Sequence, residues 1–359
     1  MKTLFICPTS TADFVMDALW AGLMQQLGLH KLIDWPVMPW RRRSAVNRKL
    51  APRWQYFEER ESMCYALQNL ALPEWSLDDV RKIVESEGFE RVFLPETAAA
   101  RHLYQQAGLG NTPVVVVSAW DAPRASIGHL LRWYGSNLEA VFLDNWLPEF
   151  QVSPNFHPIN YAMSNLDQFL PDDEARVLRA NKKYDVCFVG ANTHSLRTRH
   201  FDALRRTFPK DAEALVLIPN RSGPDRGRSG WDDSQFRGSQ PVMLRREYLT
   251  KMAQARVCVN IFGAAKSGKT VRFYEIPWVG SLMVTSPVYG QVWELVDGVH
   301  CLYFNTIPEM LDKVWWALAH PQQAEEIALA GHKFVRQYYG AKQMVEYVYS
   351  KLRGQDAAK

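Results

Sequence analysis

The sequence predicts an α/β protein of two domains, each a parallel β-sheet covered by helices. Three observations support this prediction. The chain has 359 residues, which exceeds the length at which a single hydrophobic core usually stops growing. Short apolar runs alternate with segments of helical periodicity, a pattern typical of parallel α/β layers. The alternation is interrupted by a polar stretch at residues 171–183 and then begins again.

The first half of the chain contains the units of one such domain. Strands are expected at Leu4–Cys7, Arg91–Leu94, Val114–Val117 and Ala140–Leu143. Helical spacing follows the first strand and stops at Gly28, and Ser76 is expected to cap a helix that ends at Gly88. Another helix is expected around residues 101–106. The aromatic and basic segment 38–63 has poor periodicity, and no element is assigned to it.

A domain boundary is predicted at the acidic stretch Pro171–Glu174, where the apolar pattern gives way to polar residues. This divides the chain into an N-terminal domain (residues 1–170), a C-terminal domain (residues 171–340) and a closing helix (residues 341–359). We expect that helix to pack back on the N-terminal domain.

The second domain is predicted from a further series of apolar runs. Strands are expected at Tyr184–Val189, Ala214–Ile218, Val257–Phe262, Leu282–Thr285 and Cys301–Phe304. Helices are expected after the first of these strands, from about Val271, and from a capping box at Thr306 and Glu309. The polar stretch from Asn220 to Gln240 is unusually long for a loop in a compact domain, and such loops are often functional.

Composition excludes several classes of protein. Hydrophobic residues make up 47% and charged residues 22% of the chain, and the formal net charge is +4, too small to require a polyanionic partner. The apolar runs are too short for a signal peptide or a membrane-spanning helix, so we expect a cytoplasmic protein, with no more than peripheral contact to a membrane. The cysteines have no metal-binding or disulfide spacing; they are Cys7, Cys64, Cys187, Cys258 and Cys301.

Residues 263–270, Gly-Ala-Ala-Lys-Ser-Gly-Lys-Thr, match the phosphate-binding P-loop pattern and follow a strand. A nucleotide triphosphatase or kinase is therefore one alternative. Few strands can follow this motif before the chain ends, and the best candidate for a partner strand ending in aspartate, Glu294–Asp297, is weak. An anion site on backbone amides, a helix N-terminus and Lys269 remains a sound interpretation of the motif.

Residues 270–285 resemble the donor site of glycosyltransferases with the GT-B fold, in particular the CgeB-type (spore-maturation-protein-like) enzymes. The resemblance is carried by Arg272-x-x-Glu275, by a glycine before an apolar strand, and by Gly298 with the strand that follows it. It extends to residues 184–190 and 325–349. The phage DNA β-glucosyltransferase has a similar Arg-x-x-Glu arrangement, and the glycosyltransferase group 1 family is the broader relative.

This resemblance implies two Rossmann-like α/β/α domains that face each other across a cleft, with the nucleotide sugar held by the C-terminal domain. Arg272 at a helix start suits a diphosphate, and Glu275 one turn later suits the two ribose hydroxyls. The full set of expected donor-binding residues is Gly190, His194, Arg197, Lys269, Thr270, Arg272 and Glu275. Ser267 stands where many retaining enzymes have a first glutamate, so retention and inversion both stay open.

Catalysis in such an enzyme depends on positioning and on stabilising the departing diphosphate. No metal-ligand spacing occurs, so no cofactor is expected beyond a UDP- or GDP-sugar as co-substrate. An inverting reaction would need a general base at the tip of an N-terminal strand. Asp121 and Asp13 are the candidates and Glu96 is a weaker one, although each aspartate could instead cap a helix.

The expected function is transfer of a sugar to a polysaccharide, a glycolipid or a small molecule. A nucleic-acid acceptor is the second alternative beside the triphosphatase, because basic residues gather at 41–53 and 221–237. A solvated basic loop is the better explanation of each cluster taken alone, so this alternative is not favoured. The sequence contains no signal for an oligomeric state.

Overall fold

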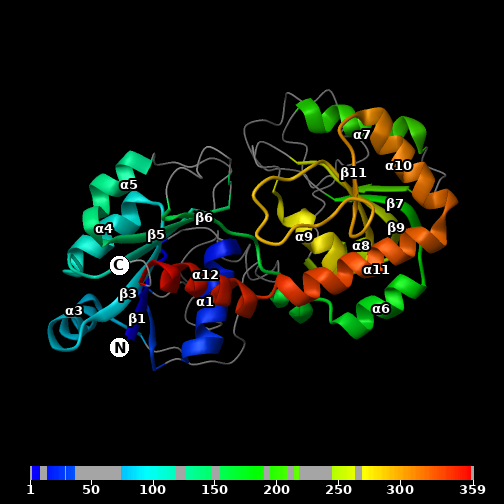
Figure 1. Cartoon of the computed structure of the whole chain (residues 1–359). Coiled ribbons are helices and arrows are strands. Elements are labelled where there is room, and N and C mark those ends of the chain that lie inside the picture. Colours follow the sequence, from blue (N-terminus) through cyan, green and yellow to red (C-terminus); the bar gives the residue numbers. More distant parts are fainter. Residues whose placement is uncertain are drawn as a thin grey trace, which may run out of the picture.

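The computed structural model describes residues 2–8, 14–28, 30–36, 74–118, 127–144, 146, 154–189, 195–208, 214–217, 245–262 and 269–356. Two parallel sheets with flanking helices form the two lobes seen in Figure 1. We call the lobe built on strands β1–β6 the N-lobe and the lobe built on β7–β11 the C-lobe. The predicted α/β class is confirmed, whereas the exact domain boundaries stay a prediction.

The N-lobe sheet has the strand order β2-β1-β3-β4-β5-β6, and every neighbouring pair is parallel. Its strands are β1 (Lys2–Phe5), β2 (Leu32–Asp34), β3 (Phe89–Pro95), β4 (Val114–Ser118), β5 (Leu138–Leu143) and β6 (Phe156–Pro158). All of β4 is buried, which explains its continuous apolar sequence, because helices cover both faces of a parallel sheet.

The described helices of this lobe are α1 (Phe14–Leu27), α3 (Leu77–Ser86), α4 (Ala98–Gln106) and α5 (Ile127–Tyr134). Helix α3 begins with a capping box in which the Ser76 side chain accepts from the Asp79 backbone amide, as the sequence predicted for Ser76. Strands β2 and β6 and helix α5 were not predicted. Each is three to eight residues long, too short for periodicity to identify.

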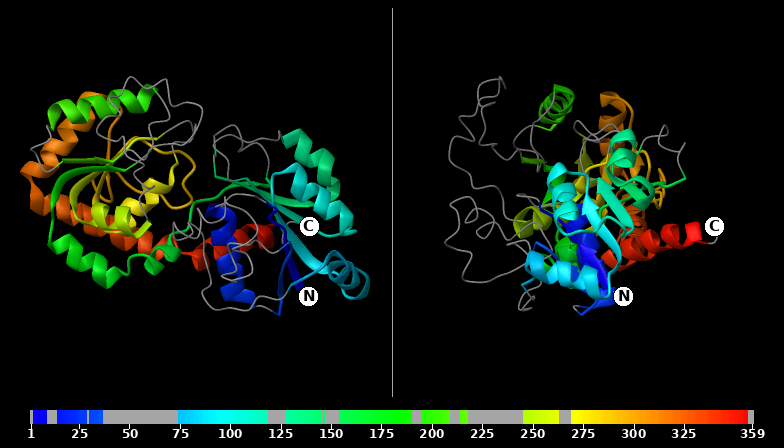
Figure 2. Two further views of the ribbon diagram at one scale, coloured as in Figure 1. Left: turned by 180° about the vertical axis from the view of Figure 1, so that it is seen from behind. Right: turned by 90° about the vertical axis from the view of Figure 1, so that its left-hand side faces the viewer.

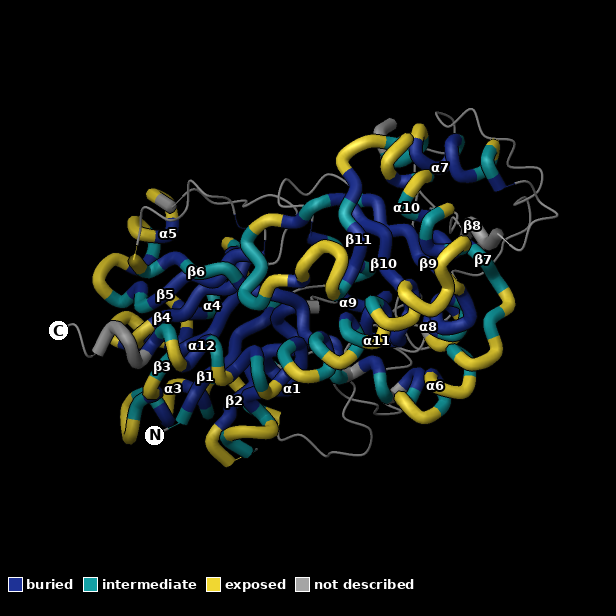
Figure 3. The backbone as a smooth tube through the Cα atoms, turned by 45° about the vertical axis from the view of Figure 1, so that its right-hand side comes forward, coloured by how far each residue is buried: buried dark blue, intermediate teal, exposed yellow. Residues whose placement is uncertain are grey.

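The C-lobe sheet has the order β11-β10-β9-β7-β8, again with parallel neighbours. Its strands are β7 (Tyr184–Val189), β8 (Ala214–Leu217), β9 (Ala255–Asn260), β10 (Leu282–Thr285) and β11 (Leu302–Tyr303). Its helices are α6 (Asp172–Ala180), α7 (Ser195–Thr207), α8 (Arg245–Ala253), α9 (Val271–Trp278), α10 (Ile307–Ala319) and α11 (Pro321–Tyr338). The central strands β4 and β10 are buried along their whole length, as the burial colouring in Figure 3 shows.

Two connections join the lobes. One runs from β6 through the 3₁₀ turn Ser164–Gln168 to α6. The other returns from α11 into α12 (Ala341–Asp356), which packs along α1 of the N-lobe, as Figures 1 and 2 show. The two helices meet at Gly22, where a Cβ atom would lie 2.3 Å from the Ala341 carbonyl oxygen. One hydrophobic cluster includes residues of both lobes.

Candidate functional site

The order in which successive strands are added to the C-lobe sheet reverses between β7 and β9. The connection from β7 leads outward to β8, whereas the next strand, β9, lies on the opposite side of β7. In open parallel sheets, ligands bind beyond the carboxyl ends of the strands at such a switch point. The candidate donor site therefore lies at the ends of β7 and β9 and at the start of α9, which follows β9. This region contains the Arg272-x-x-Glu275 segment.

The turn before α9 is fixed to the ends of β9 and β10 by side chains. Thr270, the N-cap residue, makes no side-chain cap bond, and its hydroxyl instead donates to Asn260 Oδ1 (3.0 Å). The Asn260 amide in turn donates to Thr285 Oγ1 (3.0 Å). Asn260 and Thr285 are buried, so their hydrogen bonds are made in a setting where unpaired polar groups are costly. The start of α9 is thereby held at a fixed place above the sheet.

Glu275 is the most deeply buried charged group on α9, with no exposed surface. Arg272 Nη1 lies 2.5 Å from Glu275 Oε2, and the Tyr248 hydroxyl on α8 donates to Glu275 Oε1 (2.8 Å). The guanidinium also lies over the Tyr248 ring, 4.6 Å from its centre. The Arg272 side chain keeps 28% of its surface exposed, so it can reach a ligand while Glu275 holds it.

The electrostatics of this pair favour the charged form of Arg272. Burial acts to lower the pKa of Arg272, but the interactions with Glu275, Tyr248 and Cys187 together outweigh burial, and the pKa is raised. The guanidinium is therefore fixed as a permanent positive charge at the N-terminal end of α9, where the helix dipole also attracts anions. A bound diphosphate would interact with both the guanidinium and the N-terminal end of the helix.

Lys269 points away from the C-lobe. Its side chain is fully buried, and its ammonium donates to the Ile159 carbonyl oxygen (3.0 Å) and lies 4.0 Å from Asp144 Oδ1. Both partners stand at the carboxyl ends of N-lobe strands, after β6 and β5. Burial lowers the pKa of Lys269 to about 8, although Asp144 acts in the opposite direction. The sequence prediction of a phosphate contact for Lys269 did not foresee these partners.

Arg197, on the first turn of α7, donates twice to the Ile261 carbonyl oxygen, from Nε (3.1 Å) and Nη2 (2.8 Å). It therefore joins the helix after β7 to the end of β9, directly at the switch point. The other predicted residues of the site lie outside the described residues; they are Gly190, His194, Asp121 and Asp13. Glu96 is described and is buried at the end of β3.

Three residues of the site were missed by sequence reasoning. Asp144 follows the strand at 140–143 just as Asp121 follows the strand at 114–117, so the same argument could have found it. Asn260 ends a predicted strand, which was a weaker signal. Tyr248 had no signal, because α8 was not predicted and its hydroxyl reaches Glu275 only in the folded chain.

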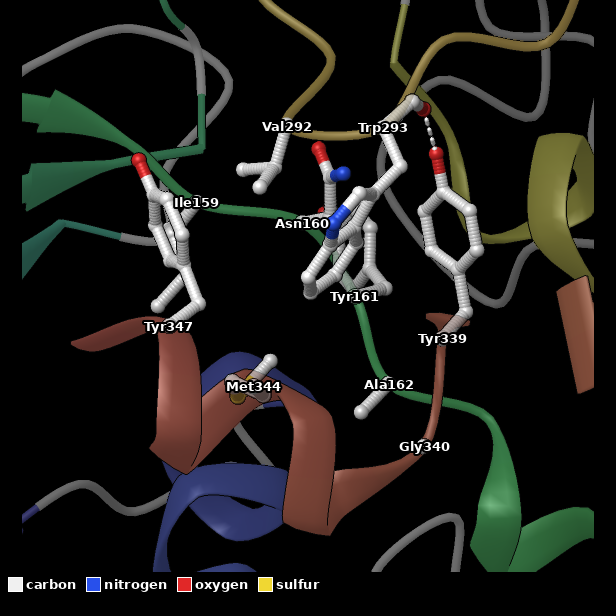
Figure 4. Close-up of a pocket in the computed structure, with 10 residues that line it drawn as sticks. All are labelled: Ile159, Asn160, Tyr161, Ala162, Val292, Trp293, Tyr339, Gly340, Met344 and Tyr347. Carbon is white, nitrogen blue, oxygen red and sulfur yellow. Dashed lines mark hydrogen bonds between the residues drawn. The ribbon is translucent and has the colours of Figure 1, made fainter. Parts of the chain in front are cut away.

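A small cavity lies between the lobes, lined by residues 159–162, 292–293 and 339–340 and by α12 (Figure 4). Its volume is about 10 Å³, the space of one water molecule, so it cannot hold a nucleotide sugar. Asn160 stands in it, buried, and accepts from the Tyr274 hydroxyl (3.2 Å), while its amide nitrogen has no partner among the described residues. Within the residues that the structure describes, no group of acidic, histidine or cysteine side chains could hold a metal ion.

Residues 197–350 match a family model described as "Glycosyl transferase-like". Solved structures similar over the whole chain include a glycosyltransferase from Rickettsia africae (10% identity, 98% of both chains, TM-score 0.60). Another is Anabaena Alr3699/HepE in complex with UDP (13% identity, 99% of this chain and 100% of that chain, TM-score 0.56). A third is sucrose-phosphate synthase from Thermosynechococcus elongatus (14% identity, 100% of both chains, TM-score 0.58). No curated protein sequence matches the chain.

These neighbours confirm the predicted fold, the GT-B arrangement of two α/β lobes. The family match confirms the predicted class of enzyme: the protein is a glycosyltransferase. Among the described helices, none has the length and apolar character needed to cross a membrane.

Proposed function

We propose that this protein transfers a sugar from a nucleotide sugar, a UDP- or GDP-sugar, to a polysaccharide, glycolipid or small-molecule acceptor in the cytoplasm, without a metal ion. The observation that carries the proposal is the buried Glu275 carboxylate, held by Arg272 and Tyr248 at the switch point of the C-lobe sheet. Structures of Anabaena Alr3699/HepE with UDP, and with UDP and glucose, share this fold and support the choice of a nucleotide sugar.

The geometry suits the nucleotide part of such a donor. Ribose hydroxyls can donate, and an ionised carboxylate only accepts hydrogen bonds, so the Glu275 carboxylate would suit the two ribose hydroxyls. Arg272, exposed on one side, would bind the diphosphate with two parallel hydrogen bonds, and Thr270 and Arg197 would border the same site.

Two further donor contacts are proposed from the sequence. Gly190 would let the nucleotide approach the end of β7 closely, and His194 would reach its phosphates. We also propose that the protein is related to the CgeB-type enzymes within its class, on the strength of the Arg272-x-x-Glu275 pattern. If the reaction inverts the anomeric carbon, Asp121 or Asp13 would act as general base.

The two alternatives are not favoured. In a P-loop enzyme the strand before the motif normally opens its domain, whereas β9 is the third strand of the C-lobe in chain order, and Lys269 turns toward the N-lobe. The alternative of a nucleic-acid acceptor rests on the basic clusters at 41–53 and 221–237, and both clusters lie outside the described residues.

A thermal-shift screen with UDP, GDP, ADP and dTDP and their glucose conjugates tests the proposal. A ligand at a hundredfold excess over its Kd stabilises the folded state by about 2.7 kcal/mol. We expect UDP or GDP compounds to raise the Tm, and Glu275→Gln to remove most of that rise. The matched control is Glu247→Gln on α8, whose exposed carboxylate pairs only with Lys251 (3.1 Å) among the described residues.

Stabilisation by none of these nucleotides would overturn the proposed function. Stabilisation that survives Glu275→Gln would place the nucleotide elsewhere. Hydrolysis of ATP or GTP that depends on Lys269 and magnesium would favour the triphosphatase instead.

A further inference from the structure

Lys269 belongs to the C-lobe by sequence but to the N-lobe by its contacts. It immediately precedes the N-cap of α9, yet its ammonium partners among the described residues include the Ile159 carbonyl oxygen and the Asp144 carboxylate, both of the N-lobe. Removing an ammonium from water costs several kcal/mol unless good partners replace the water. Since the pKa of about 8 keeps Lys269 charged at neutral pH, this contact is a charged joint between the lobes.

Helix α9 itself makes a second connection to the same N-lobe segment. Tyr274, one turn along α9, donates its hydroxyl to Asn160 Oδ1 (3.2 Å), beside the carbonyl group that Lys269 contacts. Tyr274 and Asn160 are both buried. Helix α9 and the turn before it therefore each contact residues 159–160.

A third contact reaches the N-lobe from a different part of the C-lobe. Gly290, in the segment after β10, lies so close to Trp146 that an added Cβ atom would be 2.4 Å from the Trp146 Cβ. Trp146 stands two residues after Asp144. The end of β5 is thus contacted both by the turn before α9 and by the segment after β10.

We propose that Lys269 is a positioning residue, which holds the end of β5 against the start of α9 and so sets the distance between the acceptor side and the donor side of the site. Arg272 and Glu275, three and six residues later, bind the nucleotide in the proposed function, on which this inference rests. Lys269 itself makes no donor contact. It acts through Asp144 and Ile159, by keeping the N-lobe in register with α9.

The test measures the separation of the lobes and nucleotide binding independently. Spin labels are placed at Glu85→Cys on α3 and Asp312→Cys on α10, both exposed, in a Cys64→Ser background. The described cysteines, Cys7, Cys187, Cys258 and Cys301, are buried and will not take the label. Pulsed electron–electron double resonance gives the distribution of distances between the two spin labels, and calorimetry gives the Kd for UDP.

Four variants separate the roles. Lys269→Met removes the ammonium, Lys269→Arg keeps a positive charge, and Asp144→Asn removes the partner's charge. Lys182→Met is the matched control, because Lys182 is also largely buried, donates to the Ala253 and Ala255 carbonyl oxygens (3.1 and 2.7 Å), and has its pKa lowered to about 8 by burial. Its contacts, however, lie within the C-lobe.

We expect Lys269→Met and Asp144→Asn to broaden or lengthen the distance distribution, with no further change when they are combined. Lys269→Arg should restore the wild-type distribution, and Lys182→Met should leave it unchanged. The Kd for UDP should change less than about threefold in Lys269→Met, under 1 kcal/mol, because Arg272 and Glu275 are intact.

An unchanged distribution in both Lys269→Met and Asp144→Asn would overturn the proposal. A loss of UDP affinity of tenfold or more in Lys269→Met would assign Lys269 to the diphosphate, and would overturn it too. The distance measurement needs no nucleotide. It therefore tests whether Lys269 holds the lobes together even if the wild-type protein binds no nucleotide and the proposed function fails. If Lys269→Met does not fold, Asp144→Asn and Lys269→Arg carry the test.

Discussion

The carboxyl edges of the two sheets carry opposite charge. On the N-lobe edge, the buried side chains at the ends of β2, β3 and β5 are carboxylates: Asp34, Glu96 and Asp144. On the C-lobe edge, the charged side chains at and after the ends of β7 and β9 include three cations: Arg197, Lys269 and Arg272. The two edges are built alike, from parallel strands, and differ in the chemistry they can perform.

The difference matches the two halves of sugar transfer. A cationic edge stabilises the diphosphate that departs with the nucleotide, whereas an acidic edge can accept the proton of an attacking hydroxyl. The C-lobe edge also contains its own carboxylate, Glu275, which is buried and bonded to Arg272 and Tyr248. This division into a donor edge and an acceptor edge can be tested at three places. They are Arg272 on the cationic edge, the contact between the edges at Gly290, and Lys269, which extends from one edge to the other.

The largest expected effect is on the cationic edge. Arg272→Met should weaken UDP binding about 10- to 100-fold, because charge-assisted hydrogen bonds contribute about 1.5–3 kcal/mol. Uridine, which has no phosphate, should lose much less affinity. Calorimetric titration with both ligands checks this.

The control for that experiment is Arg246→Met on α8, an exposed arginine whose ion pair is with Glu174 (2.5 Å) at the surface. It should bind both ligands as the wild type does. Equal losses of UDP and uridine in Arg272→Met would mean that Arg272 supports Glu275 rather than the diphosphate.

A smaller effect is expected where the edges meet. Gly290→Ala would bring a Cβ atom to 2.4 Å from Trp146, and overpacking of this kind costs about 1–3 kcal/mol. Gly298→Ala is the matched control, because Gly298 has a similar positive φ (72° against 66°) and open space around it. Urea unfolding should therefore show Gly290→Ala to be the less stable of the two. Equal stabilities would indicate that the lobes separate easily at Trp146.

How much of this could be read from the sequence differs between fold and site. The buried strands β4 and β7 were predicted well because parallel strands have continuous apolar sequences. Strands β2 and β6, three residues each, have too few residues for any pattern. The Arg272-x-x-Glu275 pair was predicted from local spacing, and the structure brings its members together.

The partners that come from distant segments could not be predicted. Tyr248 reaches Glu275 from 27 residues away. Lys269 reaches the Ile159 carbonyl from 110 residues away, so its local glycine-rich sequence suggested a phosphate site when tertiary contacts direct it to the other lobe. Sequence spacing indicates which groups share a turn of helix, but not which lobe a long side chain enters.

The smallest expected effect concerns the one described cation that crosses between the edges, and it depends on pH. The pKa of Lys269 is lowered by burial from 10.5 to about 8 in the folded protein, so between these two values the unfolded chain binds more protons than the folded one. Stability must therefore rise with pH in this window, by at most about 1.4 kcal/mol per pH unit. Below about pH 8 the contribution of this group to stability does not change with pH. Comparison with Lys269→Arg, which does not titrate there, cancels Lys182 and every other shared group. Urea unfolding at pH 7, 8, 9 and 10 gives the free energy of unfolding of both proteins. We expect the wild type to become more stable relative to Lys269→Arg only above pH 8. A constant difference would mean that the ammonium is as well solvated in the folded protein as in the unfolded chain, and that the two edges do not bury it.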